Sequence, residues 1–500
     1  MTRVATSWRA LQQMQRLTTL VLAVTLIGCS GTDPAKTRIA ATHECTLPKL
    51  VQSVRCGSIE VPENRDKPQG RNITVAFAIL PANTLTPLPD PLVLLAGGPG
   101  QAASYLGPLA AQLTGVRRYR DIVLIDQRGT GRSSPLSCPA FEPTDSIEAT
   151  LELDPVPRAQ QCAKELAARG VDAGQYTTAA WIADIDAVRA ALAYERLNLW
   201  GGSYGTRAAL EYARKFPQRV RSMVLDGVAS PSLKVPLDVW PTREAAIRAA
   251  FEACTQSPSC RERHAGYKAL IDAIDERLAG GRELTVTDPR TGEARTVRMT
   301  LAHVVAAFQA LVYLPEFASL LPEATRLAAD GDFGPLYAAA AAMTSGLNDQ
   351  VNSALYYSVT CAEDVPRITP AERDAKLADI PARGLAQSGL AVCDSWPRGT
   401  APPDAATALT SDIPTLLLSG GLDPVTPPAY AAEVAKTLRN SRHIVAPGYG
   451  HNVSPHACAP RLIAAFVDDP SFGKLPEPCV RHLEQSTRPL FWPDRLAPRP

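Results

Sequence analysis

The sequence predicts an α/β protein with a mostly parallel sheet and an inserted helical domain. Short strand-like runs alternate with helical segments in residues 45–235, and the same pattern returns in residues 411–480. Parallel strands need helical crossovers, and these cover both faces of a sheet. Residues 236–410, in between, are rich in Ala and show helical spacing without strand-like runs. We therefore expect a core made of the first two parts, with residues 236–410 as a helical cap over the carboxyl edge of the sheet.

The composition is that of a folded globular protein without a charge bias. The chain has 500 residues, of which 45% are hydrophobic and 20% are charged, and its formal net charge is +1. This balance gives no clustered basic surface, so we expect no nucleic-acid partner. Pro is the exception, because 44 residues in 500 are nearly twice the usual share of about 5%. Many turns and loops should therefore separate short elements.

The N-terminus has the features of an export signal. Residues 1–28 contain three Arg and no acidic residue, and they end in an apolar run from Leu17 to Ile27. This run is too short for a membrane-spanning helix, which needs about 20 residues. A basic stretch, a short apolar stretch and a small residue at the break indicate a secretory signal peptide.

The cleavage region also resembles the bacterial lipoprotein box. It reads Leu26-Ile27-Gly28-Cys29, which makes Cys29 the lipidated first residue of the mature chain. An ordinary signal peptide with an incidental Cys29 is the alternative. Ser30 after the cysteine resembles sorting to an outer membrane. We expect residues 29–44 to be a tether and the lipid to be the chain's only membrane contact.

Ten further cysteines indicate disulfides. Exported proteins form disulfides in an oxidising compartment, so five bridges between sequential neighbours are our working model. The spacing alone leaves the connectivity open. We expect no metal site, because the sequence has no Cys-x-x-Cys and no His-Glu-x-x-His. The ten residues are Cys45, Cys56, Cys138, Cys162, Cys254, Cys260, Cys361, Cys393, Cys458 and Cys479.

The elements of the core are predicted in alternation. A helix over Ala179–Tyr194 has apolar residues at helical intervals, and we expect Asp184 and Asp186 to lie on its solvated side. A second helix ends at Lys215, and residues 481–500 form a Pro-rich tail. The expected strands are Val54–Val61, Ile73–Leu80, Pro91–Ala96, Asp121–Asp126, Leu197–Trp200, Val220–Leu225, Ile413–Ser419 and Ser441–Ala446.

One turn between a strand and a helix has the residues of a nucleophile. Gly201-Gly202-Ser203-Tyr204-Gly205 fits Gly-x-Ser-x-Gly, with a short buried strand before it and an amphipathic helix after it. A strained strand-to-helix turn holds the Ser hydroxyl at the sheet edge, and glycines stand where side chains would clash. We therefore predict Ser203 as a nucleophile. The amide of Tyr204, at the helix start, would donate to a developing oxyanion.

A serine nucleophile needs a base and an orienting carboxylate, which follow it in the order Asp or Glu, then His. Asp423 comes directly after the strand that ends at Ser419, although a turn-forming role before Pro is its alternative. His451 follows the next strand in a Gly-rich loop, and we predict Asp423 and His451 as the partners of Ser203. The other late histidines fit less well, because they lie within a strand or further on beside Pro and Cys: His443, His456 and His482.

The segment Gly97-Gly98-Pro99-Gly100 has two interpretations. After a strand, and with Asp126 ending the next strand, it nearly matches a dinucleotide-binding fingerprint. Pro99, however, lacks an N–H group that a pyrophosphate would use. The loop can instead complete an oxyanion hole through the amide of Gly98, opposite Tyr204. This interpretation uses every motif, so we expect no cofactor.

Four motifs in order resemble those of the α/β-hydrolase peptidases, in the branch of proline iminopeptidase and secreted tripeptidyl aminopeptidase. They are Leu95–Gly100, Asp126–Ser133, Gly201–Gly205 and Gly420–Pro427. The likeness extends from Cys45 to Cys479 and includes a TAP-like C-terminal region. It implies an α/β-hydrolase fold and a serine exopeptidase acting at a free N-terminus. Proline iminopeptidases usually have His before Gly-Gly-Pro-Gly; Ala96 stands there in this chain, which favours the tripeptidyl type.

An aminopeptidase must hold the α-ammonium of its substrate with a carboxylate. The resemblance points to Glu363, and Asp364 lies beside it where the cap returns to the core. A solvated loop with Asp364 as a turn residue is the other interpretation. The predicted protein is an exported serine aminopeptidase whose partners are peptides with a free N-terminus. A carboxylesterase or lipase on the same fold and a non-catalytic binding lipoprotein are the alternatives.

Overall fold

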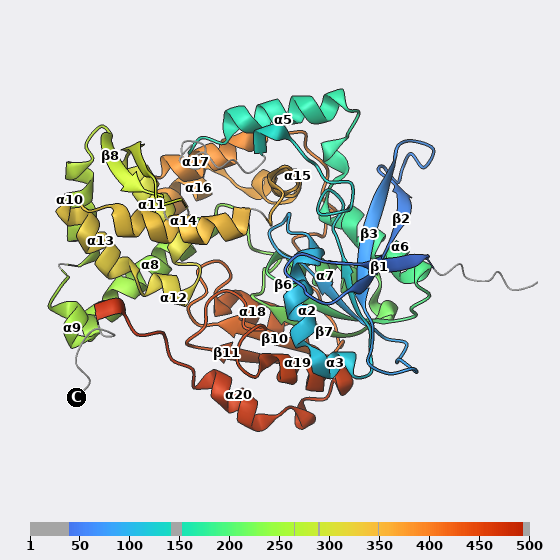
Figure 1. Ribbon diagram of the computed structural model, residues 1–500. Coiled ribbons are helices and arrows are strands. Elements are labelled where there is room, and N and C mark those ends of the chain that lie inside the picture. The colour runs from blue at the N-terminus through green and yellow to red at the C-terminus, as the bar shows by residue number, and fades with distance from the viewer. Residues whose placement is uncertain (1–39, 142–152, 265, 289–290, 349, 494–500) are drawn as a thin grey trace, which may run out of the picture. The chain divides into compact units, whose positions relative to one another are not determined.

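The computed structural model describes residues 40–141, 153–264, 266–288, 291–348 and 350–493 (Figure 1). The predicted signal peptide, Cys29 and most of the tether lie outside these residues. Across the described parts of the chain, none of the helices combines the length and the apolar character that a membrane crossing requires.

A nine-stranded sheet forms the centre of the fold, in the order β1-β2-β3-β5-β4-β6-β7-β10-β11. The first three strands are antiparallel, and the six from β5 to β11 are parallel. The predicted mostly parallel α/β fold is confirmed. The strands are β1 Thr42–Cys45, β2 Val54–Pro62, β3 Asn72–Leu80, β4 Leu92–Leu95, β5 Ile122–Ile125, β6 Leu197–Gly202, β7 Val220–Asp226, β10 Thr415–Gly420 and β11 Ser441–Ala446.

Helices cover both faces of this sheet, and each face has its own apolar cluster. Strand β4 shows the division, because Val93 and Leu95 belong to one cluster and Leu92 and Leu94 to the other. Side chains alternate along a strand, so a buried strand is apolar at every position. The first face carries α5 (Val156–Ala168), α6 (Thr178–Ala191) and α7 (Tyr204–Lys215). The second carries α2 (Gly107–Gln112), α3 (Thr114–Arg117), α19 (Ala459–Asp468) and α20 (Glu477–Glu484).

The cap has an apolar cluster of its own, formed by residues between Ile247 and Met343. It contains an antiparallel pair of strands, β8 (Arg282–Thr287) and β9 (Ala294–Met299), which corrects the expectation of an all-helical cap. These strands are mostly exposed and bury only alternate residues, so they lack the apolar run that marks a core strand. The cap helices are α8 (Val239–Gln256), α9 (Pro258–Arg261), α10 (Tyr267–Arg277), α11 (Leu301–Leu311), α12 (Pro315–Ala318), α13 (Leu321–Asp330) and α14 (Gly334–Asn348).

Some of the last part of the region 236–410 packs with the core. Helix α15 (Ser353–Glu363) contributes Leu355, Val359 and Cys361 to the cluster on the first face of the sheet. Leu409 joins the same cluster. Beyond α15, Leu377 and Leu390 form a small apolar cluster with Leu237, at the start of the predicted cap. By packing, residues 353–410 are therefore divided between the core and the cap. The remaining helices are α16 (Pro370–Leu377), α17 (Gly384–Ala391) and α18 (Pro428–Ala435).

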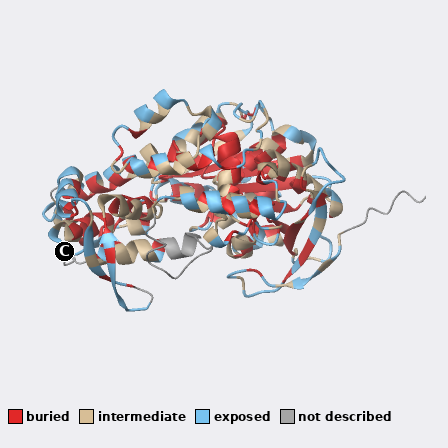
Figure 2. Cartoon of the chain, turned by 90° about the horizontal axis from the view of Figure 1, so that it is seen from above, coloured by how far each residue is buried: buried red, intermediate tan, exposed pale blue. Residues whose placement is uncertain are grey.

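Burial follows these layers (Figure 2): the central strands are buried, and the outer sides of the covering helices are exposed. Helix α20 continues to Glu484, so the Pro-rich tail begins later than residue 481. Val480 and Leu483 on this helix pack into the second face of the sheet. This amphipathic pattern explains why the segment is helical despite the neighbouring prolines.

Five disulfides join cysteines that are neighbours along the chain, as in the working model. They indicate a protein that folds in an oxidising compartment after export. The pairs are Cys45–Cys56, Cys138–Cys162, Cys254–Cys260, Cys361–Cys393 and Cys458–Cys479.

Candidate active site

Ser203 lies in a sharp turn between β6 and α7, at the carboxyl edge of the sheet. Its φ of 55° is in the left-handed region, which is strained for a residue with a side chain. A Cβ atom on Gly201 would lie 2.5 Å from the carbonyl oxygen of Gly205, and one on Gly205 would lie 2.1 Å from that of Leu95. The two glycines therefore allow the close backbone approach that holds Ser203 in this turn.

The glycine loop after β4 borders Ser203. A Cβ atom on Gly97 would lie 3.0 Å from the Cβ of Ser203 and 3.6 Å from its Oγ. Gly98 and Gly100 have φ values of 107° and 110°, which favour glycine. Tyr204 begins α7, where the first amides of a helix have no intrahelical acceptor. The loop and the helix start thus approach the hydroxyl of Ser203 from two sides.

Asp423 follows β10, and both oxygens of its carboxylate have hydrogen-bond partners. Oδ2 accepts hydrogen bonds from the Thr426 hydroxyl at 2.8 Å and is 2.8 Å from His451 Nδ1, while Oδ1 accepts from the amides of Val425 and Thr426. Burial by itself would raise the pKa of Asp423. The attraction of His451 and these hydrogen bonds outweigh burial and hold that pKa below its ordinary value of 3.8. Asp423 is therefore a stable anion beside the imidazole.

The loop that carries His451 is anchored to the loop that carries Asp423. A Cβ atom on Gly420 would lie 1.9 Å from the carbonyl oxygen of Gly450, so the two loops touch at their backbones. The amide of Leu422 also donates to the carbonyl of Tyr449 at 2.9 Å. The Thr426 hydroxyl lies 3.2 Å from His451 Nδ1. These contacts fix the distance between the carboxylate and the imidazole.

The Asp226–Gly227 segment, at the end of β7, connects the surroundings of Ser203 and His451. The amide of Ser203 donates to the carbonyl of Asp226 at 2.9 Å, and a Cβ on Gly227 would lie 3.1 Å from His451 Cε1. The Asp226 carboxylate accepts from the amides of Val453 and Ser454, just beyond the histidine. His451 Nε2 is buried and has no hydrogen-bond partner among the described residues. The imidazole is thus bound on its Nδ1 side and free on its Nε2 side.

The cap contributes an aromatic contact to this site. The ring of Tyr313, which follows α11, meets the His451 ring edge-on, with 5.0 Å between centroids. The guanidinium of Arg243, on α8, lies 6.0 Å from the centroid of Tyr313. Burial lowers the pKa of Arg243, which the nearby Tyr313, Tyr356 and Asp423 only partly offset. On the cap side of the site, His451 therefore faces the aromatic ring of Tyr313, and the guanidinium of Arg243 lies near that ring.

The motif that begins at Asp126 has a structural role. The Asp126 carboxylate accepts from the amides of Ser104 and Arg132 at 2.8 and 3.1 Å, so it is not available to a ribose. Arg128 forms two hydrogen bonds with Asp184, and both side chains are fully buried. These contacts disfavour the dinucleotide interpretation.

The expectation that Asp184 and Asp186 are solvated is wrong. Asp184 is buried against Arg128, and Asp186 is half-buried between Arg189 and Arg219. The helix α6 is covered on the side that carries these acids, because arginines from distant segments reach across it. Sequence periodicity along one helix cannot reveal that cover.

Glu363 and Asp364 lie at the end of α15, and both are buried. Glu363 accepts hydrogen bonds from the amide and the hydroxyl of Thr178, each at 2.7 Å. The Thr178 hydroxyl lies 2.5 Å from the hydroxyl of Tyr204, so Glu363 connects to the residue after Ser203. Asp364 is bound by the guanidinium groups of Arg207 and Arg367.

Burial raises the pKa of Glu363 to about 7, although Arg207 and the hydrogen bonds from Thr178 act to lower it. Glu363 is among the residues that line a cavity of about 320 Å³, together with Arg207, Glu211 and Arg214 of α7. Ser203 and His451 are not among the lining residues of that cavity. The structure therefore links Glu363 to Tyr204 through Thr178, and the cavity beside Glu363 does not include the nucleophile.

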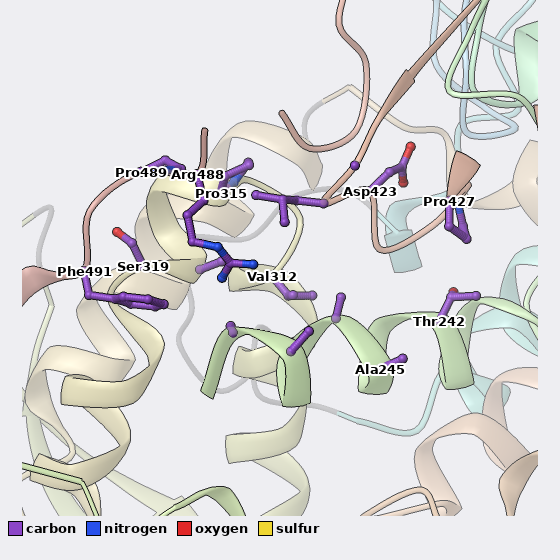
Figure 3. Close-up of a pocket in the computed structure, with 16 residues that line it drawn as sticks. Thr242, Ala245, Val312, Pro315, Ser319, Asp423, Pro427, Arg488, Pro489 and Phe491 are labelled. Carbon is purple, nitrogen blue, oxygen red and sulfur yellow. The ribbon is translucent and has the colours of Figure 1, made fainter. Parts of the chain in front are cut away.

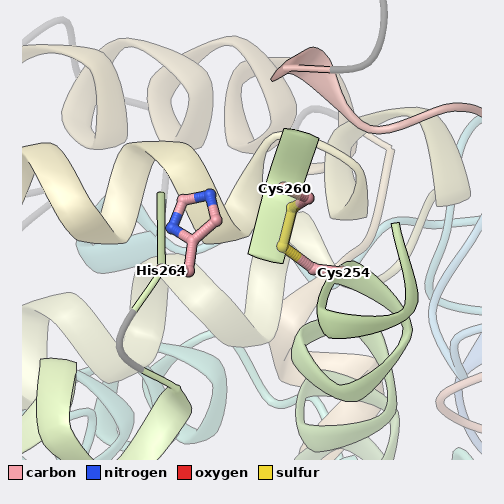
Figure 4. A group of neighbouring side chains, drawn as sticks. All are labelled: Cys254, Cys260 and His264. Carbon is pink, nitrogen blue, oxygen red and sulfur yellow. A yellow bond between two sulfur atoms is a disulfide. The ribbon is translucent and has the colours of Figure 1, made fainter. Parts of the chain in front are cut away.

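One group of potential metal ligands lies in the cap, at Cys254, Cys260 and His264 (Figure 4). The two cysteines form a disulfide, so neither offers a thiolate. Burial lowers the pKa of His264, with Glu323 acting in the opposite direction. The oxidised group cannot hold a metal ion with thiolate ligands.

Three residues beside the predicted triad were missed by sequence reasoning: Thr426, Asp226 and Tyr313. The sequence contained a signal that could have placed two of them near the site. Thr426 follows Asp423 closely, and Asp226 ends a parallel strand. Tyr313 had none, since its position beside His451 depends on how the cap packs on the core.

Two family models match the chain. One is described as alpha/beta hydrolase fold and matches residues 90–265, and the other is described as TAP-like protein and matches residues 382–479. Serine protease Hip1 of Mycobacterium tuberculosis (strain ATCC 25618 / H37Rv) is 25% identical over 476 residues, which cover 84% of this chain and 88% of that protein.

Two Streptomyces coelicolor (strain ATCC BAA-471 / A3(2) / M145) proteins are more similar over shorter stretches. Tripeptidyl aminopeptidase is 34% identical over 203 residues, covering 37% of this chain and 36% of that protein. Probable proline iminopeptidase is 36% identical over 236 residues, covering 41% of this chain and 61% of that protein.

The fold, the turn at Ser203 and the matched models define the class: the chain has the α/β-hydrolase fold. It is an enzyme of the serine hydrolase kind, related to serine peptidases. More particularly, it combines the α/β-hydrolase domain with a TAP-like C-terminal region, which includes Asp423 and His451. The resemblance inferred from four sequence motifs is confirmed.

Proposed function

We propose that the protein is an exported serine aminopeptidase that hydrolyses peptide bonds near a free N-terminus through Ser203, His451 and Asp423. The observation that carries this proposal is the arrangement of His451. Its Nδ1 lies 2.8 Å from the Asp423 carboxylate, and its buried Nε2 has no partner among the described residues. A base needs one nitrogen held by an acid and the other free for the nucleophile's proton.

The proposed reaction has two stages. Ser203 Oγ attacks the scissile carbonyl carbon while His451 Nε2 takes its proton, and the resulting oxyanion accepts hydrogen bonds from the amides of Gly98 and Tyr204. The imidazolium then gives the proton to the leaving amine, and an acyl group remains on Ser203. Water attacks this ester with His451 again as the base, which releases the acid and restores the hydroxyl. Asp423 stabilises the imidazolium in both stages.

The exopeptidase part of the proposal needs a carboxylate for the substrate ammonium. Asp364 is a poor candidate because two arginines already bind it. Glu363 remains our candidate, since its oxygens bind Thr178 rather than an arginine, and Thr178 connects it to Tyr204, the residue after Ser203. The names of the two Streptomyces relatives support the choice of an aminopeptidase over an esterase.

The test compares free and N-terminally blocked chromogenic peptides with a simple ester. Wild-type protein should cleave the free peptides and lose nearly all activity on the blocked ones. Ser203→Ala should remain folded and lose several orders of magnitude of turnover together with fluorophosphonate labelling. Equal turnover of free and blocked substrates would favour an esterase or endopeptidase. Retained turnover in folded Ser203→Ala would refute the triad.

The role of Glu363 has its own experiment. Glu363→Gln keeps the shape of the side chain and removes the charge. If Glu363 binds ammonium, kcat/KM for free peptides should fall much more than kcat/KM for the ester, because only the peptides carry the ammonium. Equal declines would make Glu363 a structural residue.

We further propose that lipid on Cys29 anchors the mature chain to the bacterial cell envelope. Support comes from the sequence around Cys29 and from the five disulfides, which indicate export. Wild-type protein should fractionate with membranes, and Cys29→Ala should be released in soluble form. Equal solubility of the two proteins would refute the anchor.

A further inference from the structure

A second cavity, of about 280 Å³, lies between the cap and the C-terminal segment (Figure 3). Its floor is one face of α8, which presents alanines and Thr242, and its other walls include Val312, Leu422 and Phe491. Ser203 and His451 are not among its lining residues. Among the proposed catalytic groups, the cavity therefore includes only Asp423.

One cation projects into this apolar space. Figure 3 shows the guanidinium of Arg488 pointing from the C-terminal segment toward α8, beside Phe491. Its carbon lies 6.0 Å from the centroid of the Phe491 ring. No carboxylate among the described residues forms an ion pair with Arg488. Burial lowers the pKa of Arg488, as expected for a cation without a compensating anion.

The only carboxylate in the lining cannot serve as that anion. In Figure 3, Asp423 lies apart from Arg488, on the side of the cavity toward Pro427. Its oxygens already accept hydrogen bonds from Thr426, Val425 and His451. A ligand anion would therefore be attracted to the Arg488 end of the cavity and repelled from the Asp423 end.

We propose that this cavity binds a carboxylate with an apolar body. The carboxylate would pair with Arg488, whose planar guanidinium suits two parallel hydrogen bonds, and the body would lie along α8 toward Leu422. Mostly apolar walls with one convergent polar group are typical of small-molecule sites. Two sources share this chemistry: a medium-chain fatty acid, and a peptide or amino-acid derivative with an apolar C-terminal residue.

The experiment is isothermal titration of the purified protein with two carboxylates and their neutral amides. Octanoate with octanamide represents the fatty acid, and N-acetyl-leucine with N-acetyl-leucinamide represents the peptide terminus. We expect one of the carboxylates to bind one per chain, with a Kd at least about tenfold below that of its amide, because only the carboxylate pairs with the guanidinium. The carboxylate that binds identifies the source.

Two variants locate the binding. Arg488→Gln should remove the preference for the carboxylate, whereas Arg481→Gln, at a side chain that is 57% exposed, should keep it. Ala249→Trp should block both ligands, because Ala249 lines the cavity from an exposed position on α8 where a larger side chain disturbs little packing.

The proposal is overturned if neither carboxylate binds better than its amide, or if folded Arg488→Gln keeps the preference. Should Arg488→Gln fail to fold, two measurements still test the proposal. One is the preference of wild-type protein for the carboxylate over its amide, and the other is the loss of binding in Ala249→Trp. The measurement is binding alone, so its failure would leave the proposed peptidase activity untouched.

Discussion

Replacing Glu363 by Gln should stabilise the protein at high pH and leave it nearly unchanged at low pH. Glu363 is buried, and its pKa of about 7 lies well above the ordinary 4.5 because burial disfavours the charged form. The amide of Gln resembles the protonated carboxyl: its oxygen can accept from the Thr178 amide, and its N–H can donate to the Thr178 hydroxyl. The substitution therefore removes the ionisation without removing the hydrogen bonds.

The sign and size follow from linkage. The folded protein holds the Glu363 proton more tightly than the unfolded chain, so this group stabilises the fold at low pH, and that stabilisation is lost as the pH rises from 4.5 to about 7. At about 1.4 kcal/mol per pKa unit, the loss amounts to about 3 kcal/mol. Above pH 7 to 8 the difference in the free energy of unfolding between wild type and Glu363→Gln should be constant, although the wild type still carries the charge.

Urea unfolding of both proteins at several pH values between 4 and 9 measures this difference. The free energy of unfolding of Glu363→Gln minus that of wild type should rise through this range and then level off. Glu372→Gln is the control of opposite sign, because Lys234 and Lys376 hold the pKa of Glu372 at about 2. Removing the charge of Glu372 should destabilise the protein at neutral pH. A difference for Glu363→Gln that does not change with pH would refute the reasoning.

Three further substitutions test the contacts around the site. Asp423→Asn should lower kcat by about 10³- to 10⁴-fold with little change in the fold, because the imidazole loses its anionic partner; retention of a tenth of wild-type kcat would contradict this role. Thr426→Val removes one hydrogen bond to the Asp423 carboxylate and should lower kcat by about tenfold, measured with the same free peptide; an unchanged kcat would make that contact dispensable. Arg207→Met leaves the buried Asp364 with only Arg367 and should cost about 3 kcal/mol in urea unfolding; a cost below about 1 kcal/mol would show that Arg367 suffices.

Much of the fold and of the candidate site could be predicted from residues close together in the chain. The turn at Ser203 depends on a strand, two glycines and a helix within one short segment, so its residues specify its geometry locally. The rule that the acid and then the histidine follow the nucleophile selected Asp423 and His451, which the structure brings to 2.8 Å of each other. Disulfide partners were also neighbours in sequence.

The tertiary structure alone decided which polar groups are buried and what they contact. Asp184 has the pattern of a solvated residue, yet Arg128 covers it from another segment. Tyr313 meets His451 only because the cap packs on the core. The partners of Glu363 likewise come from a helix far away in sequence. Local patterns report the chain's own geometry, whereas burial and pKa depend on groups that folding brings together from distant segments, and no single segment contains that information.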